Sequence, residues 1–176
     1  SKQHLMEKMF ASSKRPFYQS TQILTIGAID CESYAGFASN HFSKRNTTLP
    51  KEVFNTIYDK FGGHTWYIQF LLNRLYGYNK DVDLELVNYA MEQIIAEQNY
   101  PYADLLKAYS VGQVRLLNAI AREGCVKEIL AGNFMKKHNL RAASSVSASL
   151  KRLIDNELVY KASDGYIVYD RLMNEW

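Results

Sequence analysis

The chain has 176 residues, of which 47% are hydrophobic and 22% are charged, and its formal net charge at pH 7 is +3. This composition is ordinary for a globular protein, and the length suits one large domain or two small ones. No apolar run approaches the roughly 20 residues that a membrane-spanning helix needs, so we expect no membrane partner.

The positive charge is concentrated in the second half of the chain. Residues 1–108 contain 11 Lys and Arg against 11 Asp and Glu, whereas residues 109–176 contain 10 against 7. An excess of basic residues favours a polyanion as the partner of that half. The excess is modest, so charge alone does not decide the partner.

The cysteines and histidines form no metal-site pattern. Cys31 and Cys125 are far apart without CxxC spacing, and the four histidines are isolated from one another. Two such cysteines are typical of free thiols in a reducing compartment, which predicts a cytoplasmic protein. Neither residue type has the spacing of a zinc site, so we expect no metal.

The first 30 residues predict a helix and then a single strand. Residues 1–10, SKQHLMEKMF, have apolar side chains at helical spacing, and Lys14-Arg15-Pro16 ends this pattern. Residues 22–26 predict an apolar strand without a nearby partner, and a lone strand leaves its backbone groups unpaired. We therefore expect the chain to be a piece of a longer protein that holds the rest of the sheet. The strand would pair with a neighbouring chain, lie disordered or be pinned against helices.

Residues 30–98 have a helical period throughout, and short loops divide them into four helices, as in a compact helical bundle. The predicted starts of these helices are marked by Asp30 or Ser33, by Pro50, by Thr65 as an N-cap and by Asp83. Gly62-Gly63 ends the second helix. Tyr100-Pro101-Tyr102 predicts a break and a hinge, because proline disfavours helix at the residue before it.

The second domain is predicted to begin near Ser110. A helix through residues 114–121 ends at Gly124, and residues 126–130 predict a short extended segment. A short helix around Phe134 follows, and then a turn.

The helix from Ala142 to Asn156 is the clearest element of the chain. Its apolar positions recur at helical spacing and mark one buried face. These positions are Val146, Leu150, Leu153 and Ile154, with Leu158 just beyond. Residues 159–161 and 166–169 then alternate like strands, and Ser163-Asp164-Gly165 between them favours a tight hairpin turn. Helix, turn, helix and two-stranded wing together resemble a winged helix-turn-helix domain.

The exposed face of this helix is small, hydroxylic and basic, which suits close approach to a DNA groove. If the domain binds DNA, the helix should enter the major groove. The candidate contacts are Ser144, Ser145 and Arg152 near bases or phosphates, Lys151 and Lys161 on phosphates, and Lys136, Lys137 and Arg141 flanking the groove. Asp155 and Asp164 stand beside these positions and oppose an anion, so contact with a protein remains equally open.

The printed sequence contains no enzyme motif. It has no GxxxxGK[ST] or GxGxxG phosphate-binding loop, no GxSxG and no HExxH. Acidic pairs such as Asp81 and Asp83 are interpreted as solvated turn residues. By its own residues the chain is not predicted to be an enzyme.

The order of these segments resembles a known family. SKQHLMEKMF, KRPFYQSTQILTI, a helical stretch, GGHTWYIQFLLNRLY and a winged helix resemble the C-terminal part of archaeal-type P-loop ATPases of the AAA+/STAND grouping, common in Bacteroides-like bacteria. The resemblance covers nearly the whole chain. It implies that residues 1–29 end an ATPase core, residues 30–108 form a helical lid and residues 109–176 form a winged helix-turn-helix domain. The expected fold is mainly α, a lid bundle followed by a winged helix with a small β-wing.

The resemblance also implies a nucleotide. The Walker A and Walker B segments would lie upstream with ATP and Mg²⁺, so this chain should hold no cofactor and be inactive alone. The residues that the resemblance places near the nucleotide are Lys14, Arg15, Gly62, Gly63 and His64. A Gly-Gly turn before a helix would expose amides and a positive helix end to an anion, although a plain helix end is the alternative. Whether Lys14 or Arg15 is an arginine finger or a solvated loop charge stays open.

Three functions therefore remain open. The chain could be the lid and output domain of an ATP-dependent switch that contacts the missing core and acts on double-stranded DNA or a protein. It could instead be a free-standing winged-helix transcriptional regulator with a helical ligand or dimerisation domain, or a module that binds only protein. A homo-oligomer is compatible with each. An in-frame GxxxxGK[ST] upstream in the gene would separate the first function from the second.

Overall fold

The computed structural model describes residues 26–176. The predicted opening helix, Lys14 and Arg15 lie outside the described residues, and so does the predicted strand at residues 22–26 apart from Ile26. Ile26 is 86% exposed and belongs to no helix or strand.

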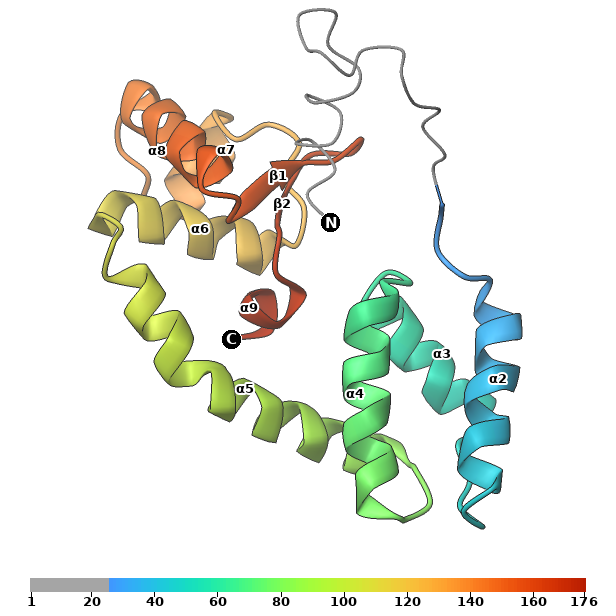
Figure 1. Ribbon diagram of the computed structural model, residues 1–176. Helices are drawn as coiled ribbons and strands as arrows, with labels where there is room; N and C mark the ends of the chain where they lie inside the picture. Colours follow the sequence, from blue (N-terminus) through green and yellow to red (C-terminus); the bar gives the residue numbers. More distant parts are fainter. Residues whose placement is uncertain (1–25) are drawn as a thin grey trace, which may run out of the picture.

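The described chain is mainly α-helical with one two-stranded antiparallel sheet, as the sequence predicts. Its elements are α2 (Cys31–Ser43), α3 (Lys51–Lys60), α4 (Thr65–Tyr78), α5 (Leu84–Leu106), α6 (Val111–Glu123), α7 (Gly132–Lys137), α8 (Ala143–Asp155), β1 (Val159–Lys161), β2 (Tyr166–Val168) and α9 (Arg171–Glu175). Figure 1 shows α2 to α4 gathered at one end, α6 to α9 with the strands at the other, and α5 joining them.

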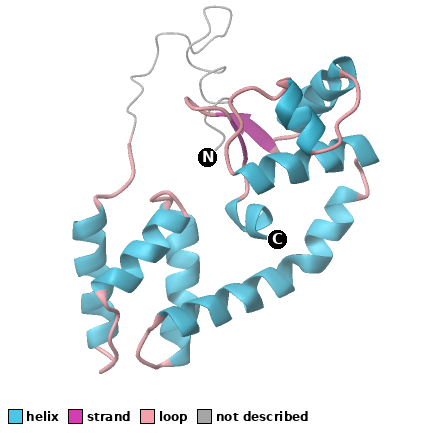
Figure 2. Cartoon of the chain, turned by 180° about the vertical axis from the view of Figure 1, so that it is seen from behind, coloured by secondary structure: helices cyan, strands magenta, loops and turns pink. Residues whose placement is uncertain are grey.

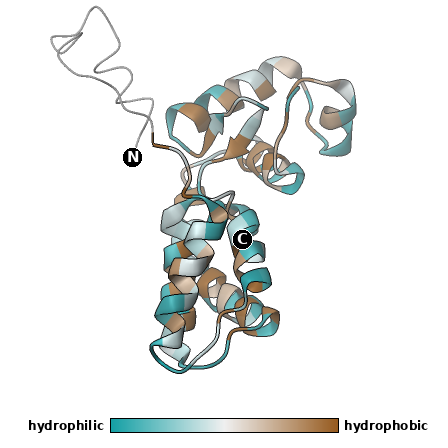
Figure 3. Ribbon diagram, turned by 90° about the vertical axis from the view of Figure 1, so that its right-hand side faces the viewer, coloured by the Kyte–Doolittle hydropathy of each residue, from teal (hydrophilic) through white to brown (hydrophobic). Residues whose placement is uncertain are grey.

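The helical bundle predicted for residues 30–98 consists of α2, α3, α4 and the first part of α5. In it α2 packs on α3, and α4 packs on α5. Hydrophobic residues recur in bands along these helices (Figure 3). The side chains of Phe54, Ile57, Ile68, Leu71, Leu75 and Ile94 are fully buried. Each contributes roughly 1.5–3 kcal/mol by leaving water, so packing of the apolar stripes holds the bundle together.

The helix starts follow the predicted caps with one exception. The Asp30 carboxylate accepts the Ser33 amide at 2.9 Å, and Asp83 accepts the Leu86 amide at 2.7 Å. Thr65 is not the N-cap of α4, because the carbonyl of His64 accepts the first helical bond from the Ile68 amide. His64 therefore takes the N-cap position, with no side-chain capping bond.

The predicted break at residues 100–102 is wrong. Helix α5 continues through Pro101 for a total of 23 residues and connects the two ends of the molecule (Figure 2). Pro101 cannot donate a bond to the carbonyl four residues earlier, which weakens a helix locally but does not forbid it. The next residue, Tyr102, is 7% exposed and is held by a contact with the far end of the chain, so tertiary packing supports the helix beyond the proline.

The helix-turn-helix consists of α6, α7 and α8. Helix α6 begins at a capping box, in which Ser110 Oγ accepts the Gln113 amide and the Gln113 side chain accepts the Ser110 amide. Gly124 ends the helix with φ 69. Helix α8 packs across α6, and the fully buried side chains there are Leu116, Ile120 and Leu153.

The wing is the hairpin of β1 and β2, with Tyr160 opposite Ile167. Of the extended segment predicted at residues 126–130, only Val126 pairs, in a single bridge to Tyr166. Gly165 turns the hairpin with φ 153, and a Cβ at this position would lie 2.6 Å from the Val126 carbonyl oxygen. The close approach of these two backbones is the reason that the turn contains glycine.

Candidate functional site

The face of α8 that the sequence assigns to DNA is exposed. Val146, Leu150 and Leu153 face the core, so the opposite side of the helix is left to solvent. The predicted contact residues Ser144, Ser145, Lys151 and Arg152 are all exposed, as is Ala148 between them. Small side chains at the start of the helix leave its backbone accessible, which a helix needs to lie deep in a groove.

Two of the predicted lysines are engaged in ion pairs. Lys151 Nζ lies 3.0 Å from the Asp155 carboxylate on the next turn of α8, and Lys137 Nζ lies 2.7 Å from Glu123. Both pairs are exposed, so each contributes little to stability. Each also lowers the net positive charge that these lysines can offer to a phosphate.

The remaining predicted cations are not paired with carboxylates in the described part of the chain. Lys136 at the end of α7, Arg141 in the turn and Arg152 on α8 are exposed. Lys161 Nζ lies 6.0 Å from the centroid of the Tyr166 ring in the wing. These four side chains come from consecutive elements that lie together in Figure 1. Their roles on DNA stay predictions.

The amides of the Gly62-Gly63 turn, which the resemblance places near a nucleotide, are already hydrogen-bonded within the chain. Gly62 and Gly63 have φ of 57 and 71, and their amides donate to the carbonyls of Asp59 and Tyr58. The His64 amide donates to the carbonyl of Phe61. Of the two alternatives for this turn, the plain helix end is therefore confirmed, because α3 uses these amides to satisfy its own last carbonyls.

The packing around Gly63 explains why this residue is glycine. A Cβ there would lie 2.7 Å from the Tyr58 hydroxyl oxygen and 2.9 Å from the Ala28 Cβ. The Tyr58 hydroxyl donates to the Ile29 carbonyl at 2.7 Å, which fixes residues 28–29 over the turn. The nearness of Gly62, Gly63 and His64 to a nucleotide remains a prediction.

The bundle and the winged helix meet at Asp170, which the sequence analysis did not identify. Tyr102 of α5 donates to one Asp170 carboxylate oxygen at 2.8 Å, and Tyr67 of α4 lies 3.3 Å from the other. The second oxygen also accepts the amides of Leu172 and Met173, so it caps α9. We call this set the Asp170 contact. Its only sequence signal is an aspartate before a short apolar helix.

Two further bonds reinforce the Asp170 contact. Lys60 at the end of α3 forms an ion pair with Glu175 of α9. The Trp176 indole Nε1 donates to the Asn99 side chain at 3.0 Å. The end of the chain is thus bonded to three helices of the bundle, and these bonds orient the winged helix relative to the bundle.

We expect the free energy of unfolding to fall as the pH rises above 10. Burial raises the pKa of Tyr67 to about 12 and also raises the pKa of Tyr102. Because an unfolded tyrosine has a pKa near 10, both residues stabilise the fold fully below that pH. For Tyr67 this stability is lost as the pH rises from about 10 to about 12, since the unfolded chain releases its proton first.

Urea unfolding followed by circular dichroism at several pH values from 8 to 12 measures this loss. The double variant Tyr67→Phe, Tyr102→Phe should show a shallower decline, because it lacks both hydroxyls. The same decline in both proteins would contradict the assignment.

The described residues also bear on two other kinds of site. In residues 26–176, no helix is both long and apolar enough to cross a membrane. Within the same range, no group of three or more His, Cys, Asp or Glu side chains is placed to hold a metal ion.

Comparisons with known proteins support the fold. A family model described as a probable winged helix domain matches residues 100–176, and no curated protein matches the chain. The chain is similar to a solved structure of a Walker-type ATPase of Pyrococcus abyssi, with a TM-score of 0.59 and 16% sequence identity. The similarity covers 94% of this chain and 47% of that one, so this chain spans about half the length of its structural relative. At this identity the likeness establishes the fold only.

Proposed function

We propose that this chain is the C-terminal part of a larger Walker-type ATPase, with a helical lid and a winged-helix output domain. Support comes from the structural likeness, which runs through the bundle and the winged helix together and covers about half of the relative. In this proposal ATP and Mg²⁺ bind an upstream core that carries the phosphate-binding loop. The present chain follows the state of that core through the lid and does not hydrolyse ATP by itself.

We further propose that the winged helix binds double-stranded DNA with α8 in the major groove. The observation that carries this proposal is the exposed serine and arginine face of α8, which is flanked by cations from other elements. Arg152 lies on α8, Lys136 and Arg141 precede it, and Lys161 follows in the wing. In this proposal these cations contact the two phosphate backbones that border the major groove.

A protein partner is the second candidate. It is favoured by the pairing of Lys151 with Asp155 and of Lys137 with Glu123, which leaves a surface of mixed charge. A helix-turn-helix does not by itself imply DNA binding, since one fold supports many functions. The two candidates differ in their response to salt, because release of counterions from phosphates makes only DNA binding strongly salt-dependent.

Titration of the chain onto a fluorescent DNA duplex at two salt concentrations separates the candidates. We expect Arg152→Ala to weaken binding and to lower the slope of log affinity against log salt by about 1. Lys151→Ala should have a smaller effect, because this lysine is already paired with Asp155. Lys80→Ala is the matched control, since Lys80 is exposed in the loop between α4 and α5, away from α8.

Binding that does not respond to salt, or an equal loss in Lys80→Ala, would contradict the DNA proposal. Either result would leave the exposed face of α8 as a surface for a protein partner.

A further inference from the structure

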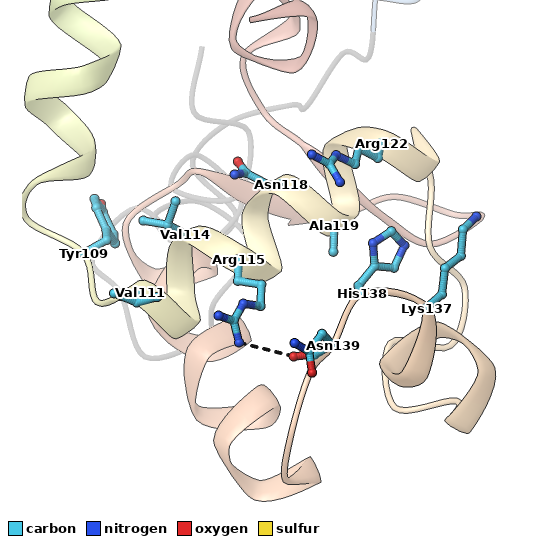
Figure 4. A pocket seen from close by; sticks show the side chains of 10 residues that line it. All are labelled: Tyr109, Val111, Val114, Arg115, Asn118, Ala119, Arg122, Lys137, His138 and Asn139. Atoms are coloured by element: carbon cyan, nitrogen blue, oxygen red, sulfur yellow. Dashed lines mark hydrogen bonds between the residues drawn. The ribbon is translucent and has the colours of Figure 1, made fainter.

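A pocket in the winged helix lies apart from the exposed face of α8. It has a volume of about 570 Å³ and lies between α6 and the turn that joins α7 to α8 (Figure 4). We call it the α6 pocket. Ala119 of α6 places only a methyl group in its wall, which leaves room between the longer side chains on either side. This volume is within the range of small-molecule sites, roughly 300–1,000 Å³.

The two ends of the α6 pocket differ in chemistry. Tyr109, Val111 and Val114 form an apolar end, whereas Arg122, Lys137 and His138 stand at the other (Figure 4). Val111 is 75% exposed, so it adds accessible apolar surface to this end of the pocket. Along the helix axis the eight steps from Val114 to Arg122 cover about 12 Å. A ligand with separate apolar and polar ends fits this arrangement.

The charged lining is positive. Arg115, Arg122 and Lys137 line the pocket, and no carboxylate does so. The neighbouring Glu123 accepts from Lys137 at 2.7 Å and lies 2.6 Å from His138 Nε2. This single carboxylate offsets only part of the positive charge of the three cations that line the pocket. The ion pair of Lys137 and Glu123 is exposed and therefore weak, so a bound anion can replace Glu123 as the partner of Lys137.

The two arginines keep most of their donors free. Arg115 donates one Nη1 bond to the Asn139 carbonyl at 3.3 Å, which leaves four of its five N–H groups. Arg122 has no ion pair or hydrogen bond among residues 26–176. Arginine binds the oxygens of a phosphate through paired N–H groups, so these side chains favour phosphate over a monovalent halide.

We propose that the α6 pocket binds a small phosphate ester with an apolar or aromatic part, of the nucleoside monophosphate class. The phosphate lies at the end formed by Arg122 and Lys137, Arg115 lines the middle of the pocket, and the apolar part lies against Tyr109 and Val114. This site is distinct from the exposed face of α8 and does not require DNA binding. Because Arg115 also holds the turn that leads into α8, a bound ligand would fix the start of that helix.

Calorimetric titration of the 176-residue chain with AMP, adenosine and inorganic phosphate tests the proposal. AMP has both parts and should bind most tightly, while adenosine and phosphate each have one part and should bind at least about tenfold more weakly. Arg122→Ala should weaken AMP binding about tenfold or more, because it removes charged hydrogen bonds. Lys127→Ala removes an exposed cation of the same domain outside the α6 pocket and should bind AMP like the unchanged chain.

Amide chemical shifts on adding AMP locate the site and should move at Arg115, Asn118 and Asn139. No saturable AMP binding at millimolar concentration, or equal binding of AMP by Arg122→Ala, would overturn the proposal. If the unchanged chain does not bind AMP and Arg122→Ala loses duplex DNA binding, these cations contact the DNA backbone instead. That result would also overturn the proposal. The AMP titrations themselves can be read whether or not α8 binds DNA, so failure of this proposal is distinguishable from failure of the DNA proposal.

Discussion

Replacement of Asp170 by alanine is expected to lower the free energy of unfolding by ~3 kcal/mol, since it removes a helix cap and two tyrosine hydrogen bonds. The carboxylate accepts the amide of Leu172 at 2.9 Å and the hydroxyl of Tyr102 at 2.8 Å, with Tyr67 at 3.3 Å. The variant leaves the hydroxyls of two buried tyrosines without their acceptor, which costs more than the lost bonds alone. The measurement is the midpoint and slope of urea unfolding near pH 7.

Matched variants separate the contribution of the Asp170 negative charge from those of its hydrogen bonds and helix cap. Asp170→Asn keeps the cap and a neutral acceptor, so it should lose less than Asp170→Ala. Asp104→Ala is the control, because its carboxylate is exposed and bonds only to the nearby Lys107. We expect a change within about 0.5 kcal/mol for this control. An Asp170→Ala loss as small as that of the control would show that the contact does not stabilise the two parts together.

The Asp170 contact is also one route by which the bundle can act on the winged helix. It joins α4 and α5 to the start of α9, and α9 packs on α6 and β2. A shift of the bundle would therefore change the bonds at Asp170, in addition to any effect carried by the continuous chain from α5 into α6. Asp170→Ala should let the two parts unfold in separate transitions, whereas the unchanged chain should unfold in one.

Replacement of Gly165 by alanine is expected to destabilise the winged helix by roughly 2–4 kcal/mol, through backbone strain and overpacking. The new Cβ would lie 2.6 Å from the Val126 carbonyl oxygen and 2.7 Å from its carbonyl carbon. Both are backbone atoms, so neither can rotate away. The φ of 153 is also a conformation that L side chains rarely adopt.

Gly36→Ala is the matched control, with an expected effect of opposite sign. Gly36 lies inside α2, and a Cβ added there would have no packing neighbour within 4 Å. Alanine there should raise stability by about 0.5–1 kcal/mol, because it favours helix more than glycine does. Thermal unfolding of both variants measures the contrast. A Gly165→Ala protein as stable as the unchanged chain would mean that the hairpin and Val126 can move apart freely.

Elements with strong local signals could be predicted from the sequence. The apolar spacing of residues 146–154 located α8 to within one residue at each end, and Asp-Gly located the hairpin turn. Gly124, which was predicted to end the helix now seen as α6, is a local signal of the same kind. They succeeded because caps, turns and amphipathic periods depend on residues close in sequence.

Other features depend on residues far apart in sequence, and these only the tertiary structure decided. Local preference predicts a break at Pro101, but the bond from Tyr102 to Asp170, 68 residues later, holds the helix beyond the proline. The Gly62-Gly63 turn looks open to an anion until its amides are traced to the carbonyls of α3. The α6 pocket forms because α6 packs beside the turn between α7 and α8. No local sequence pattern indicates that these two segments lie next to each other. Local patterns specify which elements form, whereas burial and bonds between distant residues specify how those elements are joined and which of their groups remain free.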